Sequence, residues 1–140
     1  MPRVRNRRSA SVGTFTSPLR IADVNGRQSR EVEATVDTGA AYTVLPGRLL
    51  RELNVEPLGQ RRLLLADGRR MNADIGEARA TIDGETVTTL VIFGEDDAPP
   101  LLGAYTLEGL GLAVDPVEQR LVPAHLIMYQ ARLSPLPALA

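Results

Sequence analysis

The sequence contains no cysteine, no lysine and no tryptophan. The absence of cysteine excludes disulfide bonds, thiol catalysis and cysteine metal sites. All 16 positive charges are arginines, so Schiff-base formation and other lysine-dependent mechanisms are excluded as well. No run approaches the roughly 20 apolar residues of a membrane span, and no continuous apolar stretch follows the basic N-terminus. We therefore expect no membrane partner, no signal peptide and a cytoplasmic location.

The composition is that of one globular domain. The chain has 140 residues, of which 44% are apolar and 24% charged, enough for one core but small for a two-lobed enzyme. The formal net charge of −1 argues against a nucleic-acid partner. We expect a flexible tail over 1–17, a folded domain over 18–125, and a C-terminal tail over 126–140 that is a candidate dimer interface. The basic cluster of the first tail fits a solvated segment better than an anion site; it consists of Arg3, Arg5, Arg7 and Arg8.

Three β-hairpins are predicted from turn dipeptides that separate apolar or alternating runs. The turns are Asn25-Gly26, Asp67-Gly68 and Asp83-Gly84. Leucines at helical spacing predict short helices over 47–54 and through 107–110. Seven or more short strands with two short helices favour an all-β barrel or sandwich. A Rossmann unit is not expected, because no strand leads into a glycine fingerprint and a long helix.

One motif, Asp37-Thr38-Gly39, comes directly after the predicted strand that ends at Val36. It combines a carboxylate, a hydroxyl and a residue with unrestricted backbone geometry, followed by the small Ala40. Hydrolysis by paired carboxylates needs a second carboxylate facing the first, and the sequence has no second Asp-Thr-Gly. If the motif is catalytic, two copies of the chain must share one active site. Taken alone, it fits a turn-capping aspartate equally well.

Three segments, in this order, resemble the retropepsin-type aspartic proteases, in particular their small bacterial relatives. Residues 34–40 match the segment with the catalytic aspartate, and the hairpin around 65–69 matches the flap that covers the substrate. Residues 100–103, Pro-Leu-Leu-Gly, resemble the second psi-loop, and 107–116 resemble the closing helix and strand. The resemblance covers roughly 19–123. It implies an all-β fold, a closed β-barrel of the retropepsin-like (acid protease) type with one or two short helices.

The resemblance implies an aspartic endopeptidase in which each subunit of a homodimer contributes Asp37. One carboxylate, ionised, would take a proton from water, while the other, protonated, would polarise the carbonyl and later protonate the leaving nitrogen. Thr38 would tie the two loops together, and Gly39 lets its N–H approach the carboxylate. Ala40 stands where pepsin-like enzymes have a serine that donates to the aspartate. Without that donor the dyad pKa values should be higher, which predicts activity at mildly acidic to near-neutral pH.

The implied substrate is a peptide or protein segment in extended conformation, paired with the backbone of the flap. The implied substrate-binding residues are Ala40, Ala66, Asp67, Gly68, Arg69, Leu102 and Gly103. Pockets lined by residues such as Leu45, Leu102 and Ile92 would favour apolar side chains at the cleaved bond. No metal and no cofactor are implied. Two features depart from the family pattern: Tyr105 is expected to pack under the loop or alter a subsite, and the tails lack the interleaved termini of the viral dimer.

Competing interpretations concern the fold and the remaining polar residues. The same fold could serve as a catalytically inert module for peptide binding or dimerisation, or the motif could be accidental in an unrelated β-barrel.

Asp115 is expected to open an Asp-Pro turn rather than to partner Asp37. The acidic run 95–97 fits a solvated loop better than a cation site. His125, the only histidine, has no nucleophile-elbow serine to serve.

Overall fold

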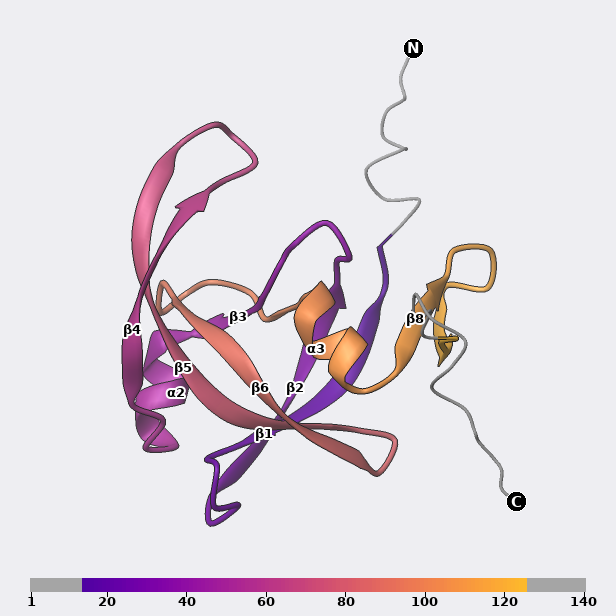
Figure 1. Ribbon diagram of the computed structural model, residues 1–140, viewed down its shortest axis with the longest axis horizontal. Coiled ribbons are helices and arrows are strands. Elements are labelled where there is room, and N and C mark those ends of the chain that lie inside the picture. Colours follow the sequence, from indigo (N-terminus) through magenta and orange to yellow (C-terminus); the bar gives the residue numbers. More distant parts are fainter. Residues whose placement is uncertain (1–13, 126–140) are drawn as a thin grey trace, which may run out of the picture.

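The computed structural model describes residues 14–125, which form nine strands and two short helices (Figure 1). The strands are β1 (Thr16–Ala22), β2 (Ser29–Val36), β3 (Thr43–Pro46), β4 (Pro57–Leu64), β5 (Arg70–Ile82), β6 (Glu85–Gly94), β7 (Leu101–Leu102), β8 (Leu112–Asp115) and β9 (Arg120–Pro123). The helices are α2 (Gly47–Glu52) and α3 (Ala104–Gly109). Both helices of the described residues have six residues each, too few to span a membrane.

Seven of the strands form one sheet in the order β1-β2-β7-β3-β6-β5-β4. An additional antiparallel pairing between β1 and β5 closes the first six of these strands into a ring. Among the strands of residues 14–125, β4 lies outside the ring and pairs with β5 alone, and β8 and β9 form a separate two-stranded sheet. The predicted mostly-β architecture, closed and with two short helices, is confirmed.

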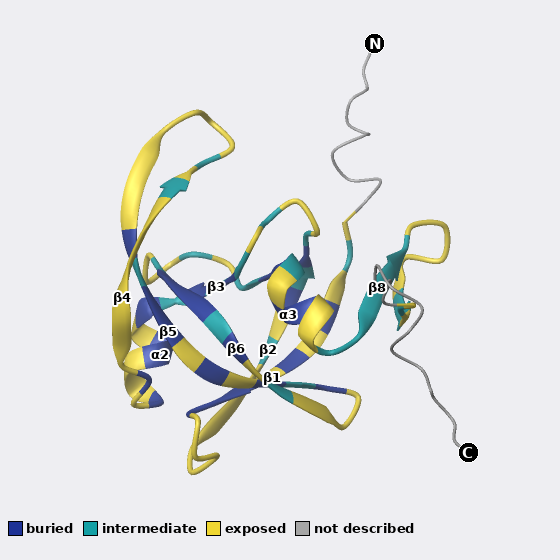
Figure 2. Cartoon of the chain, in the orientation of Figure 1, coloured by how far each residue is buried: buried dark blue, intermediate teal, exposed yellow. Residues whose placement is uncertain are grey.

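The core fills the ring with apolar side chains from alternate strand positions. In β1, for example, Leu19 and Ile21 are fully buried, whereas Arg20 between them is exposed. Leu50 of α2 and Leu107 of α3 close the core cluster and are buried in it. Figure 2 shows the buried residues concentrated in the ring, while β4 and the far end of the hairpin it forms with β5 are almost wholly exposed.

The three predicted hairpins are all present, with differences in their turns. Asp83 and Gly84 have φ of 51° and 83° and connect directly paired residues, the two-residue turn that right-handed strand twist favours. The first turn is wider, spanning residues 23–28, because Asp23 caps it by accepting hydrogen bonds from the N–H groups of Arg27 and Gln28. These donors, Gln28 first, lower the pKa of Asp23. Strand β1 begins at Thr16, inside the segment predicted as a tail.

Candidate active site

The Asp37 loop begins where β2 leaves the ring. The N–H of Asp37 donates to Leu102 O at 3.0 Å, and that of Thr35 donates to Pro100 O at 3.0 Å. These bonds join β2 to β7 in parallel, while Val44 of β3 pairs with Leu101 from the other side. Strand β7 therefore runs between β2 and β3, so that the chain before Asp37 and the chain after the loop are both fixed to it.

Gly103 allows this close approach. A Cβ atom at this position would lie 2.4 Å from Tyr42 O, a separation that real Cβ atoms do not adopt. The N–H groups after it complete the link, because Ala104 N donates to Ala40 O and Tyr105 N to Ala41 O, at 2.8 and 2.9 Å. The first turn of α3 is thereby fastened to the end of the Asp37 loop. Gly103 is buried, and its lack of a side chain leaves room for the backbone of Tyr42 and Thr43.

Three buried threonines support the site, and sequence analysis did not identify them. The hydroxyl of Thr106 lies 2.6 Å from that of Thr43 and 2.9 Å from that of Thr89. Thr43 also accepts a hydrogen bond from Gly103 N at 3.1 Å. All three threonines are at most 2% exposed, so this network satisfies polar groups that would be costly to bury alone. It links β3, β6 and α3, which are distant in sequence.

The Asp37 carboxylate is positioned by its own loop and remains partly exposed. Gly39 N donates to Asp37 Oδ1 at 2.9 Å, and Ala40 N donates to the Asp37 carbonyl at 3.2 Å. Thr38 and Gly39 are exposed. A hollow of about 470 Å³ begins at Thr38 and is lined further by α3 and β8, with Leu107 and Val114 among its apolar residues. Within residues 14–125, no side chain hydrogen-bonds to the Asp37 carboxylate.

Two of the predicted substrate-binding residues and the predicted specificity pockets need correction. Leu45 and Leu102 are 0% exposed and Ile92 is 2% exposed, so their side chains form core and present no surface to a substrate. The error arose because an apolar residue near a catalytic motif fits a pocket and a core equally well in the sequence. Leu102 and Gly103 instead shape the Asp37 loop through backbone hydrogen bonds and close packing.

The predicted flap tip is a tight, exposed turn at the end of the β4–β5 hairpin. Leu65 N donates to Arg69 O and Gly68 N to Leu65 O, at 2.8 and 2.9 Å. Asp67 accepts from Arg69 N at 3.0 Å and from Arg69 Nε at 2.8 Å. The backbone N–H and then the side chain of Arg69 lower the pKa of Asp67. No hydrogen bond or ion pair of the described chain joins Ala66 or its neighbours at the tip to the Asp37 loop.

Tyr105, the unusual residue after the second psi-loop, packs against Tyr42. The two ring centroids are 5.7 Å apart with the planes tilted by 42°. Tyr105 is 47% exposed, so about half of the residue remains accessible. The aromatic pair therefore lies where the chain leaves the Asp37 loop, since Tyr105 N also donates to Ala41 O at 2.9 Å.

Two of the remaining carboxylates singled out in the sequence, Asp96 and Asp115, have structural partners. Asp115 accepts from the N–H groups of Val117 and Glu118 at 3.0 and 3.1 Å, which confirms the predicted turn. Asp96 accepts from Arg48 N and from Arg51 Nη2, at 2.9 and 3.0 Å, and so connects the acidic loop to α2. Residues 14–125 contain no group of three or more His, Cys, Asp or Glu residues that could hold a metal ion.

The family model described as "gag-polyprotein putative aspartyl protease" matches residues 22–109. This range includes the Asp37 loop, the flap hairpin and the second psi-loop segment. It covers more than half of the chain, and it agrees with the resemblance found in the sequence. A search of curated proteins found no match.

Two solved structures are similar to the chain. The EIAV protease complexed with the inhibitor HBY-793 is 19% identical, with 81% of this chain and 92% of that chain covered and a TM-score of 0.54. The protease of Simian Foamy Virus (mac) is 18% identical, with 66% of this chain and 92% of that chain covered and a TM-score of 0.46. The likeness to the EIAV protease confirms the retropepsin-like fold.

Proposed function

Because the chain belongs to the gag-polyprotein aspartyl protease family, we propose that it is a homodimeric aspartic endopeptidase with one Asp37 from each subunit in the active site. The observation that carries this proposal is the Asp37 carboxylate itself. It is oriented by Gly39 N at 2.9 Å, anchored through a buried psi-loop, and still accessible. The chain offers no second Asp-Thr-Gly, so the partner carboxylate comes from a second copy.

The proposed reaction is hydrolysis of a peptide bond without a covalent intermediate. Two carboxyls about 3 Å apart share one proton, so one is ionised and the other protonated. The ionised carboxylate takes a proton from water as the water oxygen attacks the carbonyl carbon, which the protonated carboxyl polarises. The C–N bond then breaks as a proton passes to the leaving nitrogen. Thr38 and Gly39 are exposed in the single chain, as residues that meet a second copy must be.

Cleavage of an apolar peptide library tests the proposal. Wild type should cleave, and Asp37→Asn should lower the rate by about 10³-fold or more, because an amide cannot act as the base. Asp97→Asn is the matched control, since it removes the same charge from an exposed loop position outside the site. Its rate should equal that of wild type. If wild type and Asp37→Asn are equally inert as dimers, the chain is not a peptidase and the proposal is wrong.

A further inference from the structure

The flap hairpin has an apolar face where it joins the ring. Ala73 and Ile75 of β5 are buried, and with Ile92 of β6 they form a second core cluster. Leu63 of β4 and Val44 of β3 pack against this cluster. The contact between the base of the hairpin and β3 therefore depends on the burial of apolar side chains, which a polar group in the same place would weaken.

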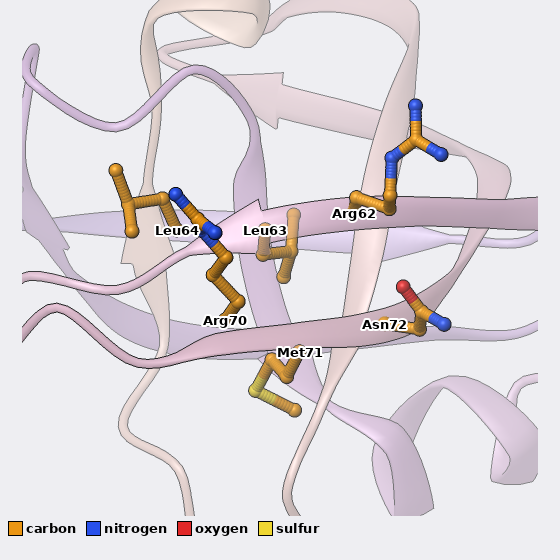
Figure 3. Close-up of a pocket in the computed structure, with 6 residues that line it drawn as sticks. All are labelled: Arg62, Leu63, Leu64, Arg70, Met71 and Asn72. Atoms are coloured by element: carbon orange, nitrogen blue, oxygen red, sulfur yellow. The ribbon is translucent and has the colours of Figure 1, made fainter.

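Met71 extends this face toward the flap tip. Side chains two residues apart share a strand face, so Met71 follows Ile75 and Ala73 along β5. It lies directly opposite Leu63 in the register of β4 and β5, at a spacing that brings the two side chains together. Figure 3 shows the Met71 side chain on the side of β5 opposite to that of Asn72. Met71 is 37% exposed, so its thioether lies where the apolar face meets solvent.

The thioether of Met71 is accessible to small oxidants. Met71 and Leu63 are among the residues that line a hollow of about 620 Å³ on the hairpin. The sequence has no cysteine to react in its place, and its other methionines, Met1 and Met128, lie outside residues 14–125. Oxidation of methionine turns a flexible apolar side chain into a polar one. At Met71 it would place a polar group beside Leu63, at the edge of the apolar face.

We propose that Met71 is a reversible oxidation site, at which a peroxide loosens the flap hairpin. The sulfur gives an electron pair to one oxygen of hydrogen peroxide, the S–O bond forms as the O–O bond breaks, and water leaves. Two thiols, acting through a methionine sulfoxide reductase, restore the thioether and are converted to a disulfide, with release of water. The sulfoxide turns away from Leu63 into solvent, so the hairpin opens more often. This loosening does not require catalysis, whereas any change in the rate of cleavage rests on the proposed function.

Hydrogen–deuterium exchange of the full-length protein, before and after treatment with hydrogen peroxide, tests the proposal. Mass spectrometry of the tryptic peptide Met71–Arg79 measures how much of Met71 has gained an oxygen atom. Once Met71 is oxidised, amide exchange over 57–72 should be about tenfold faster, because the hairpin loses part of the apolar contact that holds it. Exchange at Asp37 N, which donates to Leu102 O, should stay within about twofold of its rate before treatment.

Two variants separate Met71 from the other methionines and from peroxide itself. Met71→Leu keeps an apolar side chain of similar volume without sulfur, so peroxide should leave its exchange over 57–72 unchanged. Met71→Gln places a polar side chain of similar length there and should show the faster exchange without peroxide.

Three results would overturn the proposal. They are unchanged exchange after complete oxidation of Met71, faster exchange in peroxide-treated Met71→Leu, and no return to the original rate after treatment with methionine sulfoxide reductase and thiol. A failure of peptidase activity leaves all of these measurements unaffected, since none of them uses cleavage.

Discussion

The Asp37 loop and the flap hairpin belong to one sheet but are held in opposite ways. Backbone hydrogen bonds fix the loop to β7 and α3, and the three buried threonines lie behind it. Strand β4 of the flap hairpin pairs with one strand, β5, and nearly all of its residues are exposed. Local stability follows burial and contact density, so the hairpin should open far more easily than the loop. The proposed peptidase would need this combination, a fixed catalytic carboxylate and a movable flap.

Gly103→Ala should produce the largest effect, because it acts on the rigid region. The new Cβ would lie 2.4 Å from Tyr42 O, and a backbone atom in a closed ring cannot move aside. We expect a loss of about 3 kcal/mol or more in the free energy of unfolding, measured by urea denaturation. Gly59→Ala in β4 is the control, since its Cβ would enter open space. It should change stability by less than about 1 kcal/mol.

Thr106→Val should have the next largest effect. The substitution keeps the shape of the side chain but leaves the buried hydroxyls of Thr43 and Thr89 without their shared partner. The expected loss in unfolding free energy is about 1–3 kcal/mol. Thr86→Val removes one hydroxyl of an equally short but exposed pair with Thr81, and should cost less than about 0.5 kcal/mol. Equal losses in the two variants would show that the buried threonine network stabilises the fold no more than an exposed hydroxyl pair does.

The pH dependence of cleavage tests how residue 40 of the Asp37 loop affects the proposed catalytic carboxylate. Ala40 has no hydroxyl to donate to Asp37, so we expect wild type to be most active at mildly acidic to near-neutral pH. Ala40→Ser supplies a donor that favours the ionised carboxylate and should move the acidic limb of the rate profile to lower pH, by about one unit or less. A wild-type profile that peaks below about pH 3 would contradict this expectation.

The smallest effect is expected at the flap tip. The pKa of Asp67 lies below its ordinary value of 3.8, first because of Arg69 N–H and then because of its side chain. The stabilisation of the turn is therefore present above pH 3.8 and is lost as the pH falls through the lowered pKa. Arg69→Gln should raise the midpoint of the Asp67 carboxyl titration only part of the way toward 3.8, because the backbone N–H donor remains. Carbon NMR of the Asp67 carboxyl measures this midpoint. An unchanged midpoint would show that the Arg69 side chain does not contribute to the lowered pKa of Asp67.

The sequence predicted the parts of the fold that depend on local chemistry. Asp83-Gly84 specifies its own two-residue turn through positive φ, and the leucines of 47–54 specify a helix by spacing. The position of β7 between β2 and β3 could be expected only from the resemblance, because Leu101 and Leu102 form a strand of two residues. Nothing local in those two residues identifies the strands that they pair with.

The candidate site was predictable to a similar extent. Asp37 and Gly39 could be identified from a contiguous motif. The threonine network could not, because Thr43, Thr89 and Thr106 meet only after three separate elements have packed. The burial of Leu102 also depends on ring closure, which no local pattern encodes. The predicted tails 1–17 and 126–140, with the proposed dimer seam, lie largely or wholly outside the described residues 14–125.

The most direct test of the central claim is the distance between the two Asp37 carboxylates in a crystal structure of the protein in its dimeric state. The account predicts that their nearest oxygens lie at hydrogen-bond distance, about 2.5–3.0 Å apart, with one proton shared between them. A separation beyond about 6 Å would leave no route for the shared proton and would contradict the proposed active site.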